Sequence, residues 1–183
     1  MTNIVTEVGL EELITENYFE LITEVTDMSK RYLILTAVVA ALEKITVANG
    51  YSTDVAYVSD VLELKHPEKM DKNQFPACFP IGADEDKESA TIGISGDNMV
   101  SVLTMDIVSM VYDYHGDTQQ IRDDLIRDIE KAIVTDTDLG ALLLERPSPT
   151  TVETDRGYFG RYSVTSQEFE VTYRYNHTEG GQK

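Results

Sequence analysis

The chain begins with two stretches whose apolar residues recur at helical spacing. In residues 9–25 glutamates lie between them, so we predict a short acidic amphipathic helix that docks on the body of the protein or on a neighbouring subunit. Ser29 is a good N-cap residue for a second helix that reaches about Ala48 and stops at Asn49-Gly50. We expect this second helix to be the main core helix and to bury one face, formed by Leu35, Val38, Val39, Leu42 and Ile45.

The middle of the chain has the pattern of strands separated by turns. Residues 54–64 are β-rich and predict a strand that ends at a polar loop. The apolar run Phe75–Ile81 contains two prolines, which cannot donate to a sheet ladder, so it predicts an edge strand or an irregular segment. Residues 84–88 have the charge of an exposed loop tip, and residues 90–94 alternate like the return strand of a hairpin.

The second half of the chain predicts two strands around a helix. The longest strand candidate runs from Met99 to Tyr114, and its apolar residues fall on both faces, which is typical of a central strand. The last strand, residues 162–175, alternates apolar and polar side chains, so we expect one wet face. Between them, residues 116–134 predict a helix with a periodic apolar face: Ile121, Leu125, Ile129, Ala132 and Ile133.

This order of elements predicts an α+β fold. We expect a mixed, mainly antiparallel sheet with two main helices packed on one face, plus an N-terminal helical extension. With 183 residues the chain has the length of one compact domain. We therefore divide it into an acidic helical extension (residues 1–28), a single α+β domain (residues 29–176) and a mobile C-terminal tail (residues 177–183).

Charge narrows the range of partners. The formal net charge is −18, from 15 Lys+Arg against 33 Asp+Glu, so a direct grip on nucleic-acid phosphates or on an anionic membrane is unfavourable. Such a surface keeps a protein soluble, or lines a passage through which a polyanion slides without sticking. Cys78 is the only cysteine and no stretch has the length of a membrane helix, so we expect a chain that is made inside the cell and has no membrane partner.

Side chains with chemical potential do not form a recognisable catalytic or metal-binding pattern. Cys78 lies in an apolar run without a nearby histidine, which indicates a packed thiol. The acidic clusters 84–86 and 136–138 do not match a calcium loop, so we interpret them as solvated loop charge. Metal-ligand spacing is also missing among the three histidines, His66, His115 and His177. From these observations together we expect no enzyme activity, no cofactor and no metal.

The order of segments and three short motifs resemble a known family. The motifs are DIEKAI at residues 128–133, DLG at residues 138–140 and VTYR at residues 171–174. Together with the preceding helix and strands, they resemble the tail terminator, or tail completion, proteins of tailed bacteriophages over about residues 30 to 176. The acidic extension before residue 29 departs from that pattern.

The resemblance implies a structural virion protein without catalytic activity. Such a subunit forms a ring, usually a hexamer, that caps the tail tube, stops its polymerisation and joins it to the head connector. It would be assembled in the host cytoplasm and reside in the tail or neck of the virion, with DNA passing an acidic lumen without specific binding. Two alternatives stay open: another neck or head-to-tail connector protein, and a small-molecule enzyme whose acidic pocket is not visible in the sequence.

Interface residues can be proposed at two places. The segment from residue 81 to residue 94 is long enough to reach a neighbouring subunit or the tail tube, and its isoleucines are candidate anchors. Two arginines flank an aromatic pair near a predicted turn and would bridge to an acidic neighbour. The candidate interface residues are therefore Ile81, Ile92, Ile94, Arg156 and Arg161.

Overall fold

The computed structural model describes residues 29–59, 66–81, 84–88, 98–112, 118–155 and 161–176. The predicted helical extension (1–28) and the predicted mobile tail (177–183) lie outside the described residues. Within the described part, the order is α2 (Lys30–Glu43), η1 (Val47–Asn49), β1 (Tyr57–Val58), η2 (Pro67–Lys69), η3 (Lys72–Gln74), β2 (Ala77–Ile81), β3 (Glu85–Glu88), β4 (Asn98–Tyr112), α3 (Thr118–Thr135), α4 (Thr137–Leu142), β5 (Ser148–Thr154) and β6 (Tyr162–Asn176).

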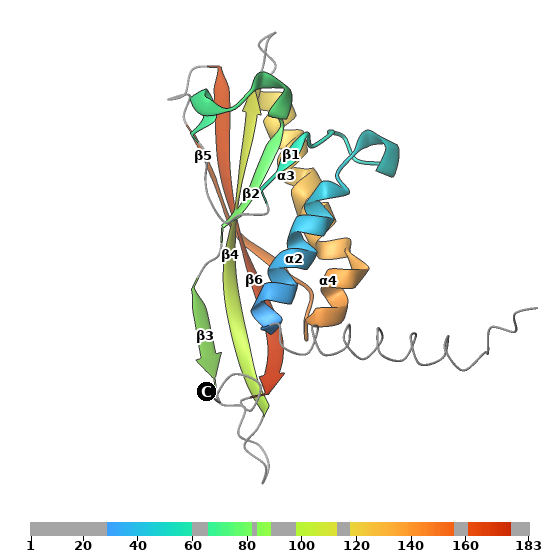
Figure 1. Cartoon of the computed structure of the whole chain (residues 1–183), viewed down its shortest axis with the longest axis vertical. Helices are drawn as coiled ribbons and strands as arrows, with labels where there is room; N and C mark the ends of the chain where they lie inside the picture. Colours follow the sequence, from blue (N-terminus) through green and yellow to red (C-terminus); the bar gives the residue numbers. More distant parts are fainter. Residues whose placement is uncertain are drawn as a thin grey trace, which may run out of the picture.

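The strands form a six-stranded sheet in the order β1-β2-β4-β6-β5, with β3 paired to β4 beside this path. The β1–β2 pair is parallel and the other pairs are antiparallel. Helices α2, α3 and α4 lie on one side of the sheet (Figure 1). The predicted fold class is therefore confirmed: a mainly antiparallel sheet carries two main helices on one face.

The paired strands β4 and β6 are the axis of the fold. Asn98 pairs with Asn176 and Tyr112 with Tyr162, so the two strands run side by side over their full lengths. Strand β4 was predicted to be central, and this is confirmed, because β2 and β3 pair along its other edge. Side chains alternate between faces along a strand, so odd-numbered residues of β4 and β6 face the helices and even-numbered residues face away.

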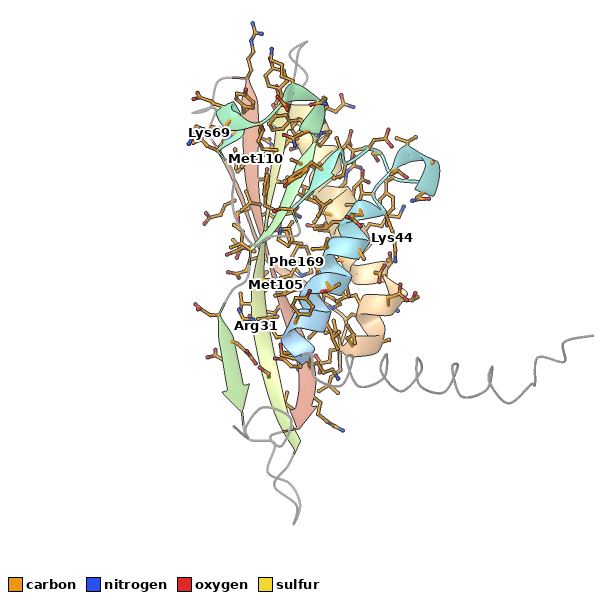
Figure 2. All side chains as sticks on the ribbon, viewed as in Figure 1. Arg31, Lys44, Lys69, Met105, Met110 and Phe169 are labelled. Atoms are coloured by element: carbon orange, nitrogen blue, oxygen red, sulfur yellow. The ribbon has the colours of Figure 1, made fainter. Side chains whose placement is uncertain are left out.

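The main core fills the space between the helices and the sheet. Phe169 from β6 and Met105 from β4 lie at its centre (Figure 2). Helix α3 buries four of its five predicted core residues, and the fifth, Ile121, packs partly against them. The face of α2 was predicted less well, because the buried residues of this helix and its exit are Ile34, Val38, Ala41, Leu42 and Ile45.

A smaller core lies on the opposite face of the sheet. It consists of Met70, Ala77, Phe79, Val108 and Met110, and residues 66–75 cover it with two short 3-10 turns. Figure 2 shows Lys69 and Met110 toward the same end of the sheet. The rest of this face is not covered by any helix of the described chain, and we call the face opposite the helices the open face.

Several predicted boundaries were wrong, each for a local reason. The predicted strand 54–64 is paired only at β1, and residues 60–65 lie outside the described part. The run Phe75–Ile81 was placed at an edge, but β2 lies between β1 and β4. It tolerates Pro80 because the short β1 pairs only with Ala77 and Cys78, so Pro80 lies beyond the end of β1.

Two edge strands and one helix were missed. Residues 84–88 were predicted to be a loop tip, but Glu85–Glu88 form β3 along β4. Strand β5 has no buried side chain, so no alternating apolar pattern marks it. Helix α4 is short, and Asp136 caps it by accepting hydrogen bonds from the backbone N–H groups of Asp138 and Leu139. In the part of the chain that is described, no helix is long and apolar enough to cross a membrane.

Candidate functional site

A basic and aromatic corner forms where β4 ends and β6 begins. We define it by five residues: Lys72, Phe75, Tyr112, Arg161 and Tyr162. The ring centroids of Tyr112 and Tyr162 are 5.0 Å apart, and Phe75 lies 5.6 Å from Tyr162 and 6.0 Å from Tyr112. These spacings are typical of favourable aromatic pairs, and they extend the smaller core to the end of the open face.

Two cations converge on one ring of this corner. Lys72 Nζ lies 5.4 Å from the centroid of the Tyr112 ring, within the range of a cation–π contact. A hydrogen bond from Arg161 lowers the pKa of the Tyr112 phenol, burial opposes this effect, and Lys72 adds a further lowering through its hydrogen bond and charge. In a chain with a net charge of −18, this corner is a local concentration of positive charge.

An acidic strip lies further along the same open face. Asp106 of β4 is directly opposite Glu168 of β6, and Glu153 of β5 pairs with the next open-face residue, Ser166. Like charges that face each other across a strand pair destabilise the sheet. Burial raises the pKa of the Asp106 carboxyl, and the charges of Glu168 and Glu153 raise it further. The fold therefore tolerates an electrostatic cost at this strip.

Charge is thus distributed unevenly over the open face. Asp106 and Tyr112 lie on the same face of β4, six residues apart, which corresponds to roughly 20 Å along the strand. The corner is cationic at one end, and the strip is anionic beyond the smaller core. Such a face can select the orientation of a charged partner, because opposite ends attract opposite charges.

One edge of the sheet, among the described residues, is strand β5, and we call it the free edge. All seven of its residues are exposed, and Val152 keeps 42% of its surface accessible. Along the described chain β5 pairs only with β6, and the backbone N–H groups of Leu144 and Asp155 continue this pairing on either side. Pro149 and a register shift before Thr151 interrupt the start of the strand. The remaining residues, 151–154, present an edge to which another strand can be added.

Of the predicted interface residues, the structure describes two. Arg161 is exposed and belongs to the corner, where it contacts Tyr112. Ile81 ends β2 opposite Asp106 and packs against the smaller core, so it is half-buried and does not lie in the corner. The structure does not bring the two together. Arg156, Ile92 and Ile94 lie outside the described residues.

Sequence reasoning missed the other members of these surfaces. Lys72, Phe75 and Tyr112 are far from Arg161 in sequence. The pairing of β4 with β6 and the position of the 3-10 turn η3 bring them close. Similarly, no spacing within the chain indicates that Asp106 faces Glu168. The alternation in β6 was a usable signal for the face of Glu168, but not for its partner.

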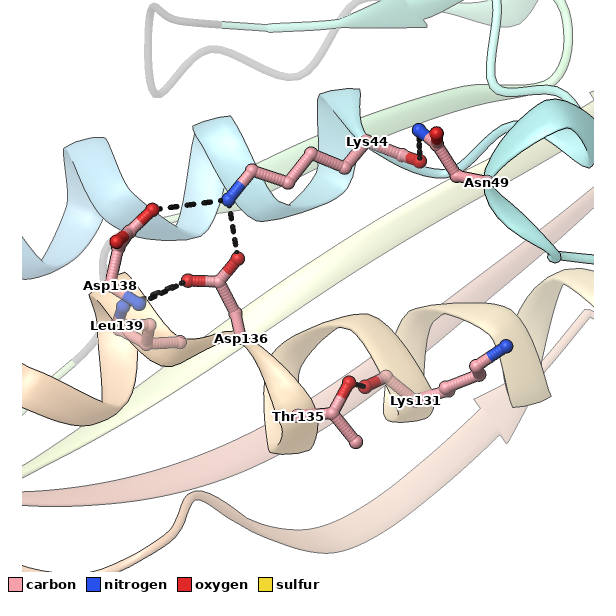
Figure 3. A network of polar contacts seen from close by, with 7 residues as sticks. All are labelled: Lys44, Asn49, Lys131, Thr135, Asp136, Asp138 and Leu139. Carbon is pink, nitrogen blue, oxygen red and sulfur yellow. Dashed lines mark hydrogen bonds and ion pairs between the residues drawn. The ribbon is translucent and has the colours of Figure 1, made fainter.

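The interpretation of the two acidic clusters, residues 84–86 and 136–138, as solvated loop charge was partly wrong. The Glu85 side chain is 12% exposed and accepts hydrogen bonds from the hydroxyls of Ser101 (2.7 Å) and Tyr173 (2.6 Å). The Asp136 side chain is 7% exposed and binds Lys44 Nζ at 2.7 Å, whereas Asp138, which also binds Lys44, is 81% exposed. The network of Lys44, Asp136 and Asp138 joins the end of α2 to the start of α4 (Figure 3). Its role is therefore structural.

Metal ligands and the single cysteine were the remaining candidates for chemistry among the described residues. Within them, no group of three or more His, Cys, Asp or Glu side chains is arranged to hold a metal ion. Cys78 is fully buried, and burial raises the pKa of its thiol to about 12, so it is not an available nucleophile. Comparisons of the chain with protein-family models and with curated proteins found no match.

Proposed function

We propose that this protein is a structural subunit of a tailed bacteriophage, a tail terminator that forms a ring on the end of the tail tube. The observation that carries the proposal is a sheet with helices on one face, an acidic strip on the other and an exposed edge strand, β5. The resemblance of the motifs at residues 128–133, 138–140 and 171–174 supplies the family.

Edge pairing gives a physical route to a ring. In a head-to-tail contact, the β5 edge of one subunit would pair with the opposite side of the next sheet, and repeated rotation closes a ring. The helices would then lie outside and the open face inside. Six copies are the number that the resemblance implies.

The acidic strip suits the inner surface of such a ring. Asp106, Glu153 and Glu168 would repel phosphates, so DNA would pass through without specific binding. The cationic corner, at the end of the sheet, would meet an acidic surface of the tail tube or of the head connector. Assembly would take place in the host cytoplasm, and the finished ring would belong to the virion.

The test is the solution mass across a concentration series, measured by light scattering after size exclusion, with and without polymerised tail tubes. We expect a ring, or a monomer that becomes a ring on tube ends and blocks their growth. Val152→Lys places a charge on the free edge and should abolish the ring, whereas Val47→Lys, at another exposed valine, should not.

Three outcomes would count against this proposal. A monomer that ignores tubes at every concentration contradicts it. A ring that ignores tubes but binds a head connector supports the neck-protein alternative instead. A ring that survives Val152→Lys as well as it survives Val47→Lys excludes the β5 edge as the contact.

A further inference from the structure

Three buried polar side chains lie between the helical layer and the sheet. We call Ser109 of β4 and Thr165 and Gln167 of β6 the polar row, and they face the helices as the other odd-numbered residues of these strands do. Ser109 is directly opposite Thr165, and Gln167 follows two residues further along β6. Their exposed fractions are 1%, 1% and 0%, so bulk solvent does not reach the row.

The hydrogen bonds of the described chain leave over one polar atom in each residue of the row. Ser109 Oγ, Thr165 Oγ1 and Gln167 Oε1 make no hydrogen bond to any group of the described residues. The Gln167 side chain is nevertheless fixed, because its Nε2 donates to the carbonyl oxygen of Ile126 in α3 at 3.2 Å. This bond leaves the amide oxygen as a buried acceptor in the same row as the two hydroxyls.

Other hydroxyls on the same face of the sheet are hydrogen-bonded. The Ser163 hydroxyl, two residues before Thr165 on β6, donates to Asp155 Oδ1 at 2.9 Å, and the Ser101 hydroxyl donates to Glu85 at 2.7 Å. Buried polar side chains have a partner in the large majority of cases, and this partner is either another protein group or an ordered water. The three atoms of the row therefore indicate a bound ligand and not a general property of this sheet.

We infer that the polar row is a binding site for an ordered water molecule that bridges these three side chains. Water fits the chemistry, since the hydroxyls of Ser109 and Thr165 can donate or accept and the Gln167 amide oxygen can only accept. A buried water typically makes about three hydrogen bonds, and the row offers partners for them. Directly opposite side chains of a strand pair have their Cβ atoms about 5 Å apart, a span that one water can bridge between two hydroxyls. A neutral ligand is favoured over an ion, because none of the three side chains is charged.

The row is close to solvent although it is buried. On β5, Val152 pairs with Gln167 and Thr154 pairs with Thr165, and both β5 residues are exposed. The row thus lies one strand away from an uncovered part of the sheet, so a bound water can exchange with solvent through small local openings of the structure. The site would join α3 to the sheet by polar contacts, next to the apolar contacts of the main core. It does not depend on the proposed ring.

A crystal structure of the unaltered protein, at a resolution that shows ordered water, tests the site directly. We expect one water within about 2.7–3.2 Å of Gln167 Oε1 and of at least one of the two hydroxyls. Hydrogen bonds from these three groups to one another or to other residues, in place of water, would overturn the inference. Density for an ion or an organic molecule in the row, or no density at all, would overturn it as well.

Oxygen-17 relaxation dispersion of the solvent tests the site in solution, because it detects water that stays bound while the protein tumbles and does not count exchanging hydroxyl protons. The double variant Ser109→Ala, Thr165→Val removes both hydroxyls with little change of shape and should lose the dispersion amplitude of about one water per protein. The control is Val111→Ala, at a buried apolar residue of the same face of β4, which should keep the amplitude because a small apolar gap stays dry. Full amplitude in the double variant, or an equal loss in both proteins, would overturn the inference.

Discussion

Helices α2 and α3 pack on the same face of the sheet but differ in their outer surfaces. Helix α3 buries Leu125, Ile129 and Ile133, and its outer residues include the exposed charged residues Asp123 and Arg127. Helix α2 has no charged residue between Tyr32 and Leu42, on either its inner or its outer surface. The pattern of charged and apolar residues in α3 therefore determines which face of that helix is buried. In α2 this pattern is missing, and packing against the sheet determines the buried face.

The inner faces of the two helices should respond alike to cavity formation. Leu42 in α2 and Ile129 in α3 are both fully buried in the main core. Changing either to alanine should lower the free energy of unfolding by about 2–5 kcal/mol, because buried contacts are lost and a cavity remains. Urea unfolding of the two variants measures this effect. A loss below about 1 kcal/mol at Leu42 alone would mean that α2 is not a true core helix.

The next largest effect concerns Asp128, a buried carboxylate of α3 that has no counterpart among the buried residues of α2. Asp128 is 4% exposed, and its Oδ2 accepts three hydrogen bonds of 2.8 Å, from the Ser52 N–H, the Thr53 N–H and the Thr53 hydroxyl. Asp128→Ala should cost about 2–3 kcal/mol, because buried donors lose a charged acceptor. Thermal or urea unfolding checks this value. Asp123→Ala, at an exposed carboxylate of the same helix, is the control and should change little.

The link between the end of α2 and α4 should depend on pH. Burial alone would raise the pKa of Asp136, but hydrogen bonds from Lys44 and from the N–H groups of Leu139 and Asp138 lower it overall. A carboxyl with a lowered folded-state pKa stabilises the fold above its unfolded pKa of about 3.9, and this contribution disappears as the pH falls through the folded value. Asp136→Asn keeps an N-cap residue but removes the charge.

We expect Asp136→Asn to cost about 1 kcal/mol at pH 7 and nearly nothing at the lowest pH at which the protein stays folded. Urea unfolding of both proteins across this range gives the comparison. A difference that stays constant with pH would show that the charge on Asp136 does not stabilise the fold. Asp138→Asn is a useful reference, because the Asp138 side chain is 81% exposed.

The same contrast explains which parts of the fold the sequence predicts. The period of charged and apolar residues in α3 identified its buried face correctly. In α2 the prediction chose Leu35 and Val39, but the structure buries Ile34 and Ala41 instead, because no charged residue between Tyr32 and Leu42 marks the outer face of this helix. Amphipathic pattern determines a face only when the other face is polar.

The edge strand β5 and the cross-strand partners could not be predicted from the pattern of apolar and polar residues. Strand β5 has no buried residue, so it lacks the alternation by which β6 was found. The corner around Tyr112 and the strip around Asp106 depend on the register between β4 and β6, which joins residues more than forty positions apart. Arg161 was identified only as a cation near a turn, and its contact with Tyr112 required the structure.

The smallest effect should come from the outer surface of α3, and it sharpens the contrast with α2. Arg127 is 70% exposed and pairs with Asp124 one turn away. Exposed pairs of this kind contribute little, so Arg127→Ala should change the free energy of unfolding by less than about 0.5 kcal/mol. Gln120→Ala, at an exposed uncharged position of the same helix, is the matched control. A cost above about 1 kcal/mol for Arg127→Ala alone would mean that this ion pair stabilises the fold, and the outer surface of α3 would then not be a merely solvated one.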